Sequence, residues 1–147
     1  YCAPADWRGL GGALTRVEVK DIEGAHEALR AGQRLRFLLH ANATFDAVVD
    51  GRRRRTAIRD ADRQLEWLLR KLSATGCRPH EVDGRLQVVV GDTWRQRGAR
   101  GKSMTTHQGV GFSGALVVDD PDRLRDALRR GVGRGRAYGF GLLTVAR

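Results

Sequence analysis

A strict alternation of polar and apolar residues marks residues 34–40. Three apolar side chains take every second position, and two arginines and a histidine take most positions between them. The apolar residues are Leu35, Phe37 and Leu39. Successive side chains of a β-strand point to opposite faces, so this period of two predicts a strand with one buried face. A short helix is predicted just before it, over residues 21–31, and Gly32 is expected to end that helix.

From Asp60 onward the apolar spacing becomes that of a helix. Four leucines recur at i, i+3, i+4 and i+7, which places them on one helical face. They are Leu65, Leu68, Leu69 and Leu72. The helix is expected to end near Gly76. Trp67 lies off the leucine face, so the pattern leaves its place in the fold open, as it does for Trp94.

Two further stretches return to a period of two. Leu86, Val88 and Val90 alternate with their neighbours in the first, and the second runs over residues 110–118. This pattern predicts two paired strands. Residues 92–104 lie between them and combine glycines with basic side chains, so we expect them to form a flexible hairpin loop.

The next helix has the clearest end signals. Asp120 can cap the free N–H groups of the first turn, Pro121 suits the first helical position, and Gly131 follows the last turn. Its predicted buried residues are Leu124, Ala127 and Leu128. A last strand is predicted over residues 140–146.

From residue 33 the predicted order is therefore strand, helix, strand, strand, helix, strand. This is the order of the ferredoxin-like βαββαβ plait, an α+β, RRM-like fold in which two helices cover one face of an antiparallel sheet. We expect residues 33–147 to form this domain and residues 1–32 to be a connector that carries the short helix. The chain opens with Tyr1 and its single methionine is Met104, so we expect it to be part of a longer protein.

The charge balance indicates the class of partner. The 147 residues include 27 lysines and arginines against 17 acidic residues, a net charge of +10. Only three of the basic residues are lysines, and the planar guanidinium of arginine suits bidentate contacts to phosphate. A polyanion such as a nucleic acid is the expected partner. Base composition of the source genome is an alternative origin for the arginines, but it does not explain the excess of positive charge.

Composition also excludes several classes of protein. No stretch approaches the roughly 18 apolar residues that a membrane-spanning helix needs, so no membrane partner is expected. Two cysteines, Cys2 and Cys77, make neither a disulfide framework nor a four-ligand zinc site, and they predict free thiols in a reducing cytoplasm. No histidines have the spacing of a metal site, so neither a metal nor another cofactor is predicted.

Basic residues gather in three clusters with few acidic neighbours. The clusters are Arg52 to Arg55, then Arg95, Arg97, Arg100 and Lys102, and then Arg129, Arg130, Arg134 and Arg136. The first two clusters, and Arg134 with Arg136 of the third, are candidates for phosphate contacts, and for the first two a solvated surface is the alternative.

The densest glycines in the chain lie in residues 131–141. They are Gly131, Gly133, Gly135, Gly139 and Gly141. The segment runs from helix to strand, whereas phosphate-cradling nucleotide loops run from strand to helix, so it is neither a P-loop nor a dinucleotide fingerprint. A helix C-cap and a tight turn explain two of the glycines. The remainder predict a backbone close to a ligand, with N–H groups exposed and Arg134 and Arg136 available for phosphate. Tyr138 either stacks on a base or belongs to the core.

The segment from Gly131 to the paired leucines 142–143 resembles the C-terminal signature of the Cas6 class of CRISPR repeat-associated proteins. Three further segments are similar to the Cas6e (CasE, Cse3) subfamily: Ala-Gly-Gln-Arg-Leu-Arg-Phe at 31–37, Ala-Asn-Ala-Thr at 41–44 and Gly-Arg-Arg at 51–53. The resemblance extends over residues 20–146.

The resemblance implies an activity, a set of partners and a missing active site. Cas6e proteins are metal-independent endoribonucleases that cut precursor CRISPR RNA at the base of each repeat stem-loop and remain bound to it as a subunit of Cascade. They contain two ferredoxin-like domains, and this chain matches the second. The catalytic histidine and its helping tyrosine lie in the N-terminal domain, so no catalytic residue is expected in this chain. His26 should not be mistaken for that base, and the chain alone is expected not to cleave RNA.

The expected partners are therefore the CRISPR repeat stem-loop RNA, other Cascade subunits and the N-terminal domain of the same protein. The predicted RNA-binding residues are Arg52, Arg53, Arg54, Arg55, Arg95, Arg97, Arg100, Lys102, Arg134, Arg136 and Tyr138, together with the glycine-rich loop. His107 either faces RNA or is bonded locally, and His40 and His80 are expected to be structural. Two alternative functions stay open: a non-catalytic RNA-binding subunit of a CRISPR effector complex, and a general nucleic-acid-binding ferredoxin-like domain.

Overall fold

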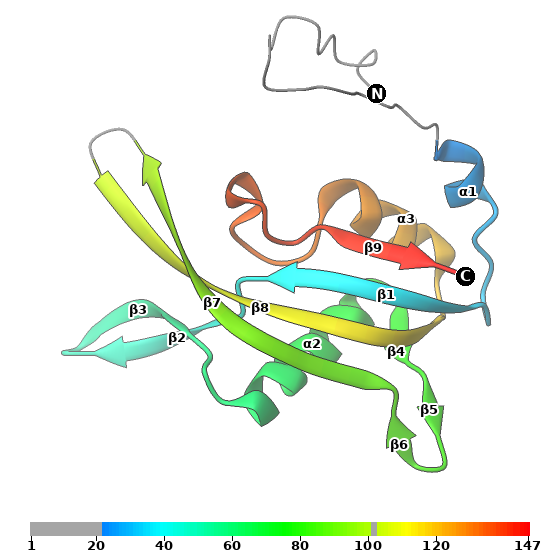
Figure 1. The fold of residues 1–147 in the computed structure, drawn as a ribbon, viewed down its shortest axis with the longest axis horizontal. Coiled ribbons are helices and arrows are strands. Elements are labelled where there is room, and N and C mark those ends of the chain that lie inside the picture. The colour runs from blue at the N-terminus through cyan, green and yellow to red at the C-terminus, as the bar shows by residue number, and fades with distance from the viewer. Residues whose placement is uncertain (1–21, 101–102) are drawn as a thin grey trace, which may run out of the picture.

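The computed structural model describes residues 22–100 and 103–147, and Figure 1 shows how their helices and strands are arranged. Three predictions fall outside the described residues: most of the connector, the thiol state of Cys2 and the RNA contact of Lys102. The side chain of Arg100 is also outside the described part.

An antiparallel sheet forms the centre of the fold (Figure 1). β1 (Arg34–Ala41) lies between β8 (Ser103–Val118) and β9 (Leu143–Ala146). β8 pairs on its other side with β7 (Val88–Arg100) and, at its far end, with β4 (Cys77–Pro79). Among the four predicted strands the last therefore lies beside the first, and the first beside the third. This order agrees with the ferredoxin-like prediction.

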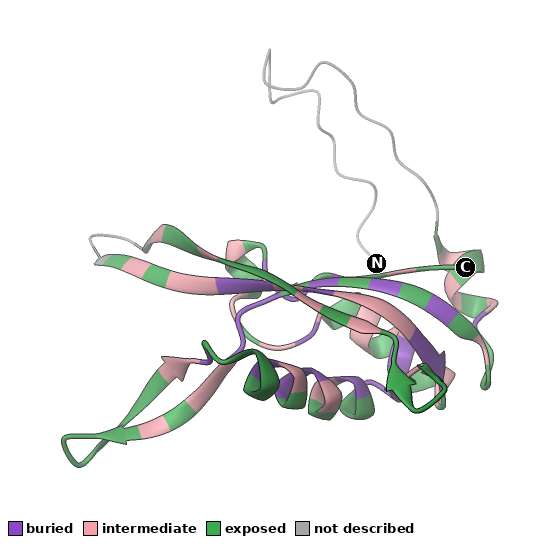
Figure 2. Ribbon diagram, turned by 60° about the horizontal axis from the view of Figure 1, so that its bottom comes forward, coloured by how far each residue is buried: buried purple, intermediate pink, exposed green. Residues whose placement is uncertain are grey.

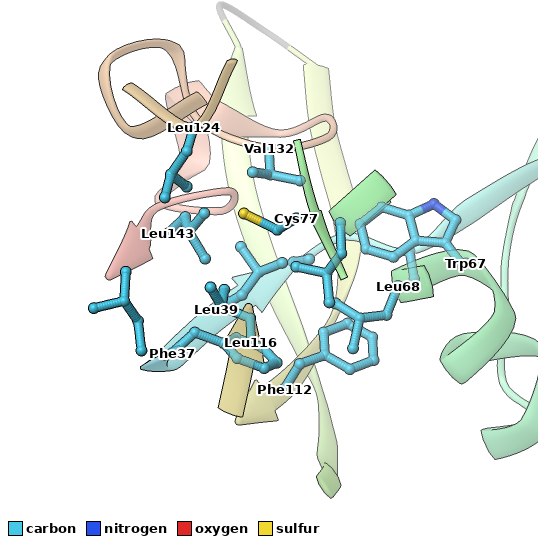
Figure 3. Packing of buried hydrophobic residues seen from close by; sticks show 14 of the residues in the cluster. Phe37, Leu39, Trp67, Leu68, Cys77, Phe112, Leu116, Leu124, Val132 and Leu143 are labelled. Carbon is cyan, nitrogen blue, oxygen red and sulfur yellow. The ribbon is translucent and has the colours of Figure 1, made fainter. Parts of the chain in front are cut away.

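Two helices and one face of the sheet enclose the core (Figures 2 and 3). α2 (Ala61–Ala74) supplies Leu68 and Leu72, and α3 (Pro121–Arg130) supplies Leu124. They pack against the alternate buried positions of the strands, which are Leu35, Phe37, Leu39, Phe112, Leu116 and Leu143. Fully burying one such side chain stabilises the fold by about 1.5–3 kcal/mol, so this apolar layer is the main stabilising feature.

The helix ends follow the local signals in the sequence. The Asp120 carboxylate accepts hydrogen bonds from the N–H groups of Asp122 and Arg123, and Pro121 occupies the first turn. Asp60 caps α2 in the same way by accepting from the Arg63 N–H. The first helix is shorter than the predicted residues 21–31: α1 covers only Glu23–Glu27.

The buried face of α2 differs from the predicted leucine face. Trp67 is 5% exposed and stacks on Phe112 with ring centroids 5.9 Å apart, so it belongs to the core. Gln64 is also buried, and its Nε2 donates to the Ile58 carbonyl oxygen at 2.9 Å. Leu65 is only half-buried, as is Leu69. The helix is rotated because the indole fills the space over Phe112, which the leucine spacing alone does not reveal.

Two hairpins were not predicted. β2 (Thr44–Val49) and β3 (Arg52–Ala57) join through Asp50-Gly51, and β5 (Glu81–Val82) and β6 (Arg85–Leu86) join through Asp83-Gly84. All four turn residues have positive φ between 50° and 74°, as a two-residue type I′ turn requires. Leu86 therefore belongs to an exposed hairpin, and its predicted place in the strand that contains Val88 and Val90 is wrong.

Two predicted boundaries also change. Residues 92–100 and 103–104 are not a flexible loop: β7 and β8 continue through these described residues as paired strands. The last strand is shorter than predicted and covers Leu143–Ala146, because the glycine-rich segment before it curves away. One bond continues the ladder beyond the strand, since the Gly141 N–H donates to the His40 carbonyl oxygen at 2.7 Å.

Candidate nucleic-acid interface

The longest projecting element is the ribbon formed by β7 and β8. Its pairing continues from Val88 opposite Gly114 to Arg100 opposite Ser103. β1 pairs with β8 only as far as Val110, so the outer part of the ribbon extends beyond the body of the sheet, as Figure 1 shows. Arg95 and Arg97 lie on this outer part, and both are exposed.

A β-bulge at the root of the ribbon decides which way these arginines face. Val90 pairs with Phe112, but the next pair is Thr93 with Val110, so β7 contains one extra residue. A one-residue insertion exchanges the two faces of every residue that follows it. Arg95 consequently lies on the helix-covered side of the sheet, in phase with Val110.

The residues that alternate with the arginines face the open side of the sheet. Trp94 lies there against His40, with ring centroids 5.2 Å apart, and stacks on Phe140 at 6.1 Å. Further along, His107 contacts the Tyr138 ring at 4.2 Å. The two faces of the ribbon are thus chemically distinct, one aromatic and one cationic.

The glycine-rich loop covers the aromatic face. Gln96 Nε2 donates to the Tyr138 carbonyl oxygen at 3.1 Å, and a Cβ added at Gly98 would lie 2.7 Å from the Tyr138 ring. Tyr138 is half-buried there, which is compatible with both predicted alternatives, stacking on a base and a place in the core. Arg134 and Arg136 are both exposed, and Arg136 donates to the Arg130 carbonyl oxygen.

The fold itself accounts for most of the loop's glycines. A Cβ at Gly131 would lie 2.9 Å from the Gly141 carbonyl oxygen, and one at Gly141 would lie 2.5 Å from the Val132 carbonyl oxygen. All five have positive φ, between 76° and 84°. Several of the N–H groups that the sequence predicts to be available to a ligand are bonded internally, including that of Val132, which donates to the Gly141 carbonyl oxygen. Any role of these glycines toward RNA remains a prediction.

The second basic cluster lies on the β2–β3 ribbon. Arg52 to Arg55 are all exposed and alternate between its two faces. Among the described residues, only Arg55 of these four has an ion-pair partner, Asp46 at 2.9 Å. Figures 1 and 2 both show this ribbon leaving the sheet at the same end as the tip of β7–β8. The structure therefore brings two basic ribbons to one end of the molecule.

Comparison with known proteins identifies the family. A family model described as "CRISPR associated protein" matches residues 3–147. The chain belongs to this family. The CRISPR-associated endoribonuclease Cse3 of Thermus thermophilus is 39% identical over an alignment 127 positions long, and the match covers 82% of this chain and 59% of Cse3. CasE of Escherichia coli K12, a Cascade subunit, is 30% identical over an alignment 145 positions long, and the match covers 90% of this chain and 66% of CasE. The chain thus spans less than two thirds of the length of either relative.

A solved structure of Thermus thermophilus Cse3, bound to an RNA that represents a pre-cleavage complex, has the same fold. It superposes with a TM-score of 0.71 at 38% identity and covers 82% of this chain and 56% of that one. The likeness supports the sheet order of this CRISPR-associated protein.

The histidines of this CRISPR-associated protein do not form a reactive cluster. His107 is bonded locally, as one of the two alternatives predicted: the Asn42 amide nitrogen donates to its Nδ1 at 3.0 Å. His80 Nε2 lies 3.4 Å from an Arg34 guanidinium nitrogen, and His40 is exposed beside Trp94. Within residues 22–100 and 103–147, no three histidine, cysteine or acidic side chains are placed to hold a metal ion.

Two other general features concern the part of the chain that the structure describes. None of its helices is long and apolar enough to cross a membrane. Cys77 is buried and is not part of a disulfide.

Burial raises the pKa of the Cys77 thiol from 9.0 to about 11, and the nearby Asp119 and Asp120 carboxylates add to the rise. A hydrogen bond to Thr75 partly opposes it. The unfolded chain therefore ionises this thiol at a lower pH than the folded one does. The contribution of this thiol to the free energy of unfolding is therefore fully present below pH 9, and it is lost as the pH rises from 9 toward 11.

Cys77 is accordingly expected to resist alkylation. In a Cys2→Ser variant, which leaves one thiol, iodoacetamide near pH 8 should not modify the folded protein during the time in which a small thiol reacts completely. Unfolding in urea should restore ordinary reactivity, because the thiolate is the nucleophile and becomes accessible. Mass spectrometry measures both rates, and equal rates with and without urea would contradict the burial of this side chain.

Proposed function

We propose that this chain is the RNA-binding C-terminal part of a Cas6e-type endoribonuclease, which binds the CRISPR repeat stem-loop, processes precursor CRISPR RNA and functions within Cascade in the cytoplasm. In this proposal residues 33–147 are the second of two ferredoxin-like domains, and residues 1–32 connect it to the first. The catalytic histidine and tyrosine belong to the first domain.

The β7–β8 ribbon is the observation that carries the proposal. It projects beyond the sheet and presents exposed arginines on one face, in a chain related to an RNA-bound endoribonuclease. The major groove of A-form RNA is deep and narrow, so a protein contacts a stem mainly through its backbone and shape. A narrow two-stranded ribbon with guanidinium groups suits contacts of this kind.

A competition assay tests the proposal. The chain would be bound to a labelled CRISPR-repeat hairpin RNA, with a DNA hairpin of the same sequence and a scrambled single-stranded RNA as competitors. We expect the unlabelled RNA hairpin to compete best, because the contacts depend on A-form shape. Equal competition by all three would contradict stem-loop recognition by this chain and favour general nucleic-acid binding.

The same samples test the division of labour between the two domains. Incubation of the hairpin with the chain in excess EDTA is expected to give no cleavage product, although the complex forms. A product at the base of the stem would show that catalytic groups lie within these 147 residues. That result would overturn the assignment of catalysis to the first domain.

A further inference from the structure

A small polar pocket lies where the β7–β8 ribbon leaves the body of the fold. Its volume is about 260 Å³, several times the roughly 30 Å³ that a water molecule occupies in the liquid. Five residues line it, and they come from β7, from β8 and from the segment between β3 and α2. They are Arg59, Thr93, Trp94, Arg95 and Gln108.

The bulge places one wall of the pocket. It directs Thr93 and Arg95 to the helix-covered side of the ribbon, and Gln108 is directly opposite Arg95 across the strand pair. Without the extra residue in β7, the side chains of Thr93 and Arg95 would face the aromatic side and the glycine-rich loop. The wall therefore depends on the irregularity of this strand.

Arg59 forms the other wall, and the residues on either side of it fix its backbone. Ile58 is 4% exposed and belongs to the core, and its N–H donates to the Ala43 carbonyl oxygen at 2.9 Å. Asp60 caps α2 through the Arg63 N–H. Arg59 itself is exposed, so a long cationic side chain extends from a firmly held position toward the root of the ribbon.

Both guanidinium groups lack a counter-charge. Among residues 22–100 and 103–147, neither Arg59 nor Arg95 has an ion pair or a side-chain hydrogen bond, whereas Arg55, Arg78 and Arg130 each pair with an aspartate. No acidic residue lines the pocket. Two like charges that border one small pocket repel each other, and an anion between them converts that repulsion into attraction.

We propose that this pocket binds a single backbone phosphate of the RNA, held between Arg59 and Arg95. Phosphate oxygens only accept hydrogen bonds, and the pocket offers donors: two guanidinium groups, the Thr93 hydroxyl and the Gln108 amide. The proposal deepens the proposed function and rests on it. It adds Arg59, which no basic cluster in the sequence contains, and a contact at the root of the ribbon that is separate from its tip.

Such a contact fixes position and not sequence. Phosphate contacts set the register of a protein on a helix without reading its bases. A phosphate held at the root would determine how far the tip of the ribbon reaches along the stem. The loss of Arg59 should therefore weaken binding to every hairpin of the same shape by a similar factor.

Substitution with glutamine tests the site, because it removes the charge and keeps a polar side chain of similar reach. We expect Arg59→Gln and Arg95→Gln each to weaken hairpin RNA binding about tenfold at low salt. The double variant should flatten the slope of log K against log salt by roughly 0.7–0.9, the value for one phosphate. A loss of about twice that slope would indicate two separate phosphates and would overturn the shared site.

Arg70→Gln is the matched control. Arg70 is also exposed and has no ion pair among the described residues, but it lies on α2 away from the pocket. It should change binding by less than about twofold, and the thermal unfolding midpoint should be the same for all variants. Equal effects of Arg59→Gln and Arg70→Gln would mean that only net charge matters, and would overturn the proposal.

Neutral linkages in the RNA identify the phosphate itself. Single methylphosphonates are placed in turn along the hairpin, and one position is expected to weaken binding to the unsubstituted chain but not to the double variant. If no position behaves in this way, the pocket does not hold a phosphate. If the unsubstituted chain does not bind hairpin RNA, the proposed function is overturned as well. If it binds hairpin RNA and Arg59→Gln leaves the affinity unchanged, only the pocket proposal is overturned.

Discussion

Replacing the basic side chains of the β7–β8 ribbon with alanine is expected to weaken hairpin RNA binding by about two orders of magnitude at low salt and to flatten its salt dependence. The substituted residues are Arg95, Arg97, Arg100 and Lys102. Each phosphate contact that is lost reduces the slope of log K against log salt by roughly 0.7–0.9, so the variant should differ most from the unsubstituted chain at low salt. Fluorescence anisotropy at several salt concentrations measures both quantities.

A charge-matched variant separates a specific interface from a general effect of charge. Alanine at four other exposed arginines lowers the net charge by the same amount but leaves both ribbons intact. These are Arg34, Arg70, Arg85 and Arg123. We expect this control to lose much less affinity and to keep its salt slope. If the two variants lose affinity equally, the ribbon is not the interface.

Trp67→Ala is expected to destabilise the fold by about 3–5 kcal/mol, the usual cost of removing a large buried aromatic side chain. The indole is 5% exposed, stacks on Phe112 and lies beneath Gly133, where an added Cβ would be 3.2 Å from the ring. Domains of this size have a total stability of about 5–15 kcal/mol, so the variant should be close to unfolding. Urea denaturation followed by circular dichroism measures the change.

Two further variants make this result specific. Trp67→Phe keeps a ring against Phe112 and should recover more than half of the lost stability. Leu65→Ala, at a half-buried leucine of the same helix, should cost less than Trp67→Ala. The opposite order would mean that the leucine face, and not the indole, is directed into the core.

The parts of the fold that were predictable have strong local signals. The alternation in β1 predicts its buried face, and Asp120 with Pro121 fixes the start of α3 to the residue. Trp67 shows the limit of such patterns. The spacing of four leucines predicts which helical face is buried, but in the structure the indole of Trp67 packs on Phe112 instead. That packing site exists only after the sheet has formed.

The exposed hairpins were missed for a different reason. β2 and β3 are exposed on much of both faces, so they lack the alternation that marks a half-buried strand, and four consecutive arginines resemble a solvated charged segment. The signal that was available is the turn, since Asp50-Gly51 is a favoured two-residue hairpin connection. The same signal, Asp83-Gly84, was available for β5 and β6.

The candidate site was predictable in composition but not in geometry. The sequence indicates that Arg95 belongs to a basic cluster, but the face that it occupies depends on one unpaired residue between Val90 and Thr93. Arg59 stands outside every cluster, and only the folded chain brings it to the same pocket. Conversely, the glycines of the loop suggested a ligand, but all five have positive φ, and backbone atoms of the loop lie close to Gly131 and Gly141, so the fold itself already favours glycine there.

The bulge in β7 also constrains how this ribbon can change during evolution. Its single extra residue shifts the alternation of the strand by one position, so every later side chain of β7 lies on the opposite face. Removing that residue, or adding a second one, would turn Arg95 toward the glycine-rich loop and Trp94 toward α2. A longer or shorter ribbon can keep both its strand pairing and its cationic face only when each strand gains or loses two residues at a time between the bulge and the tip, because a single residue per strand would reverse the faces of all residues beyond it.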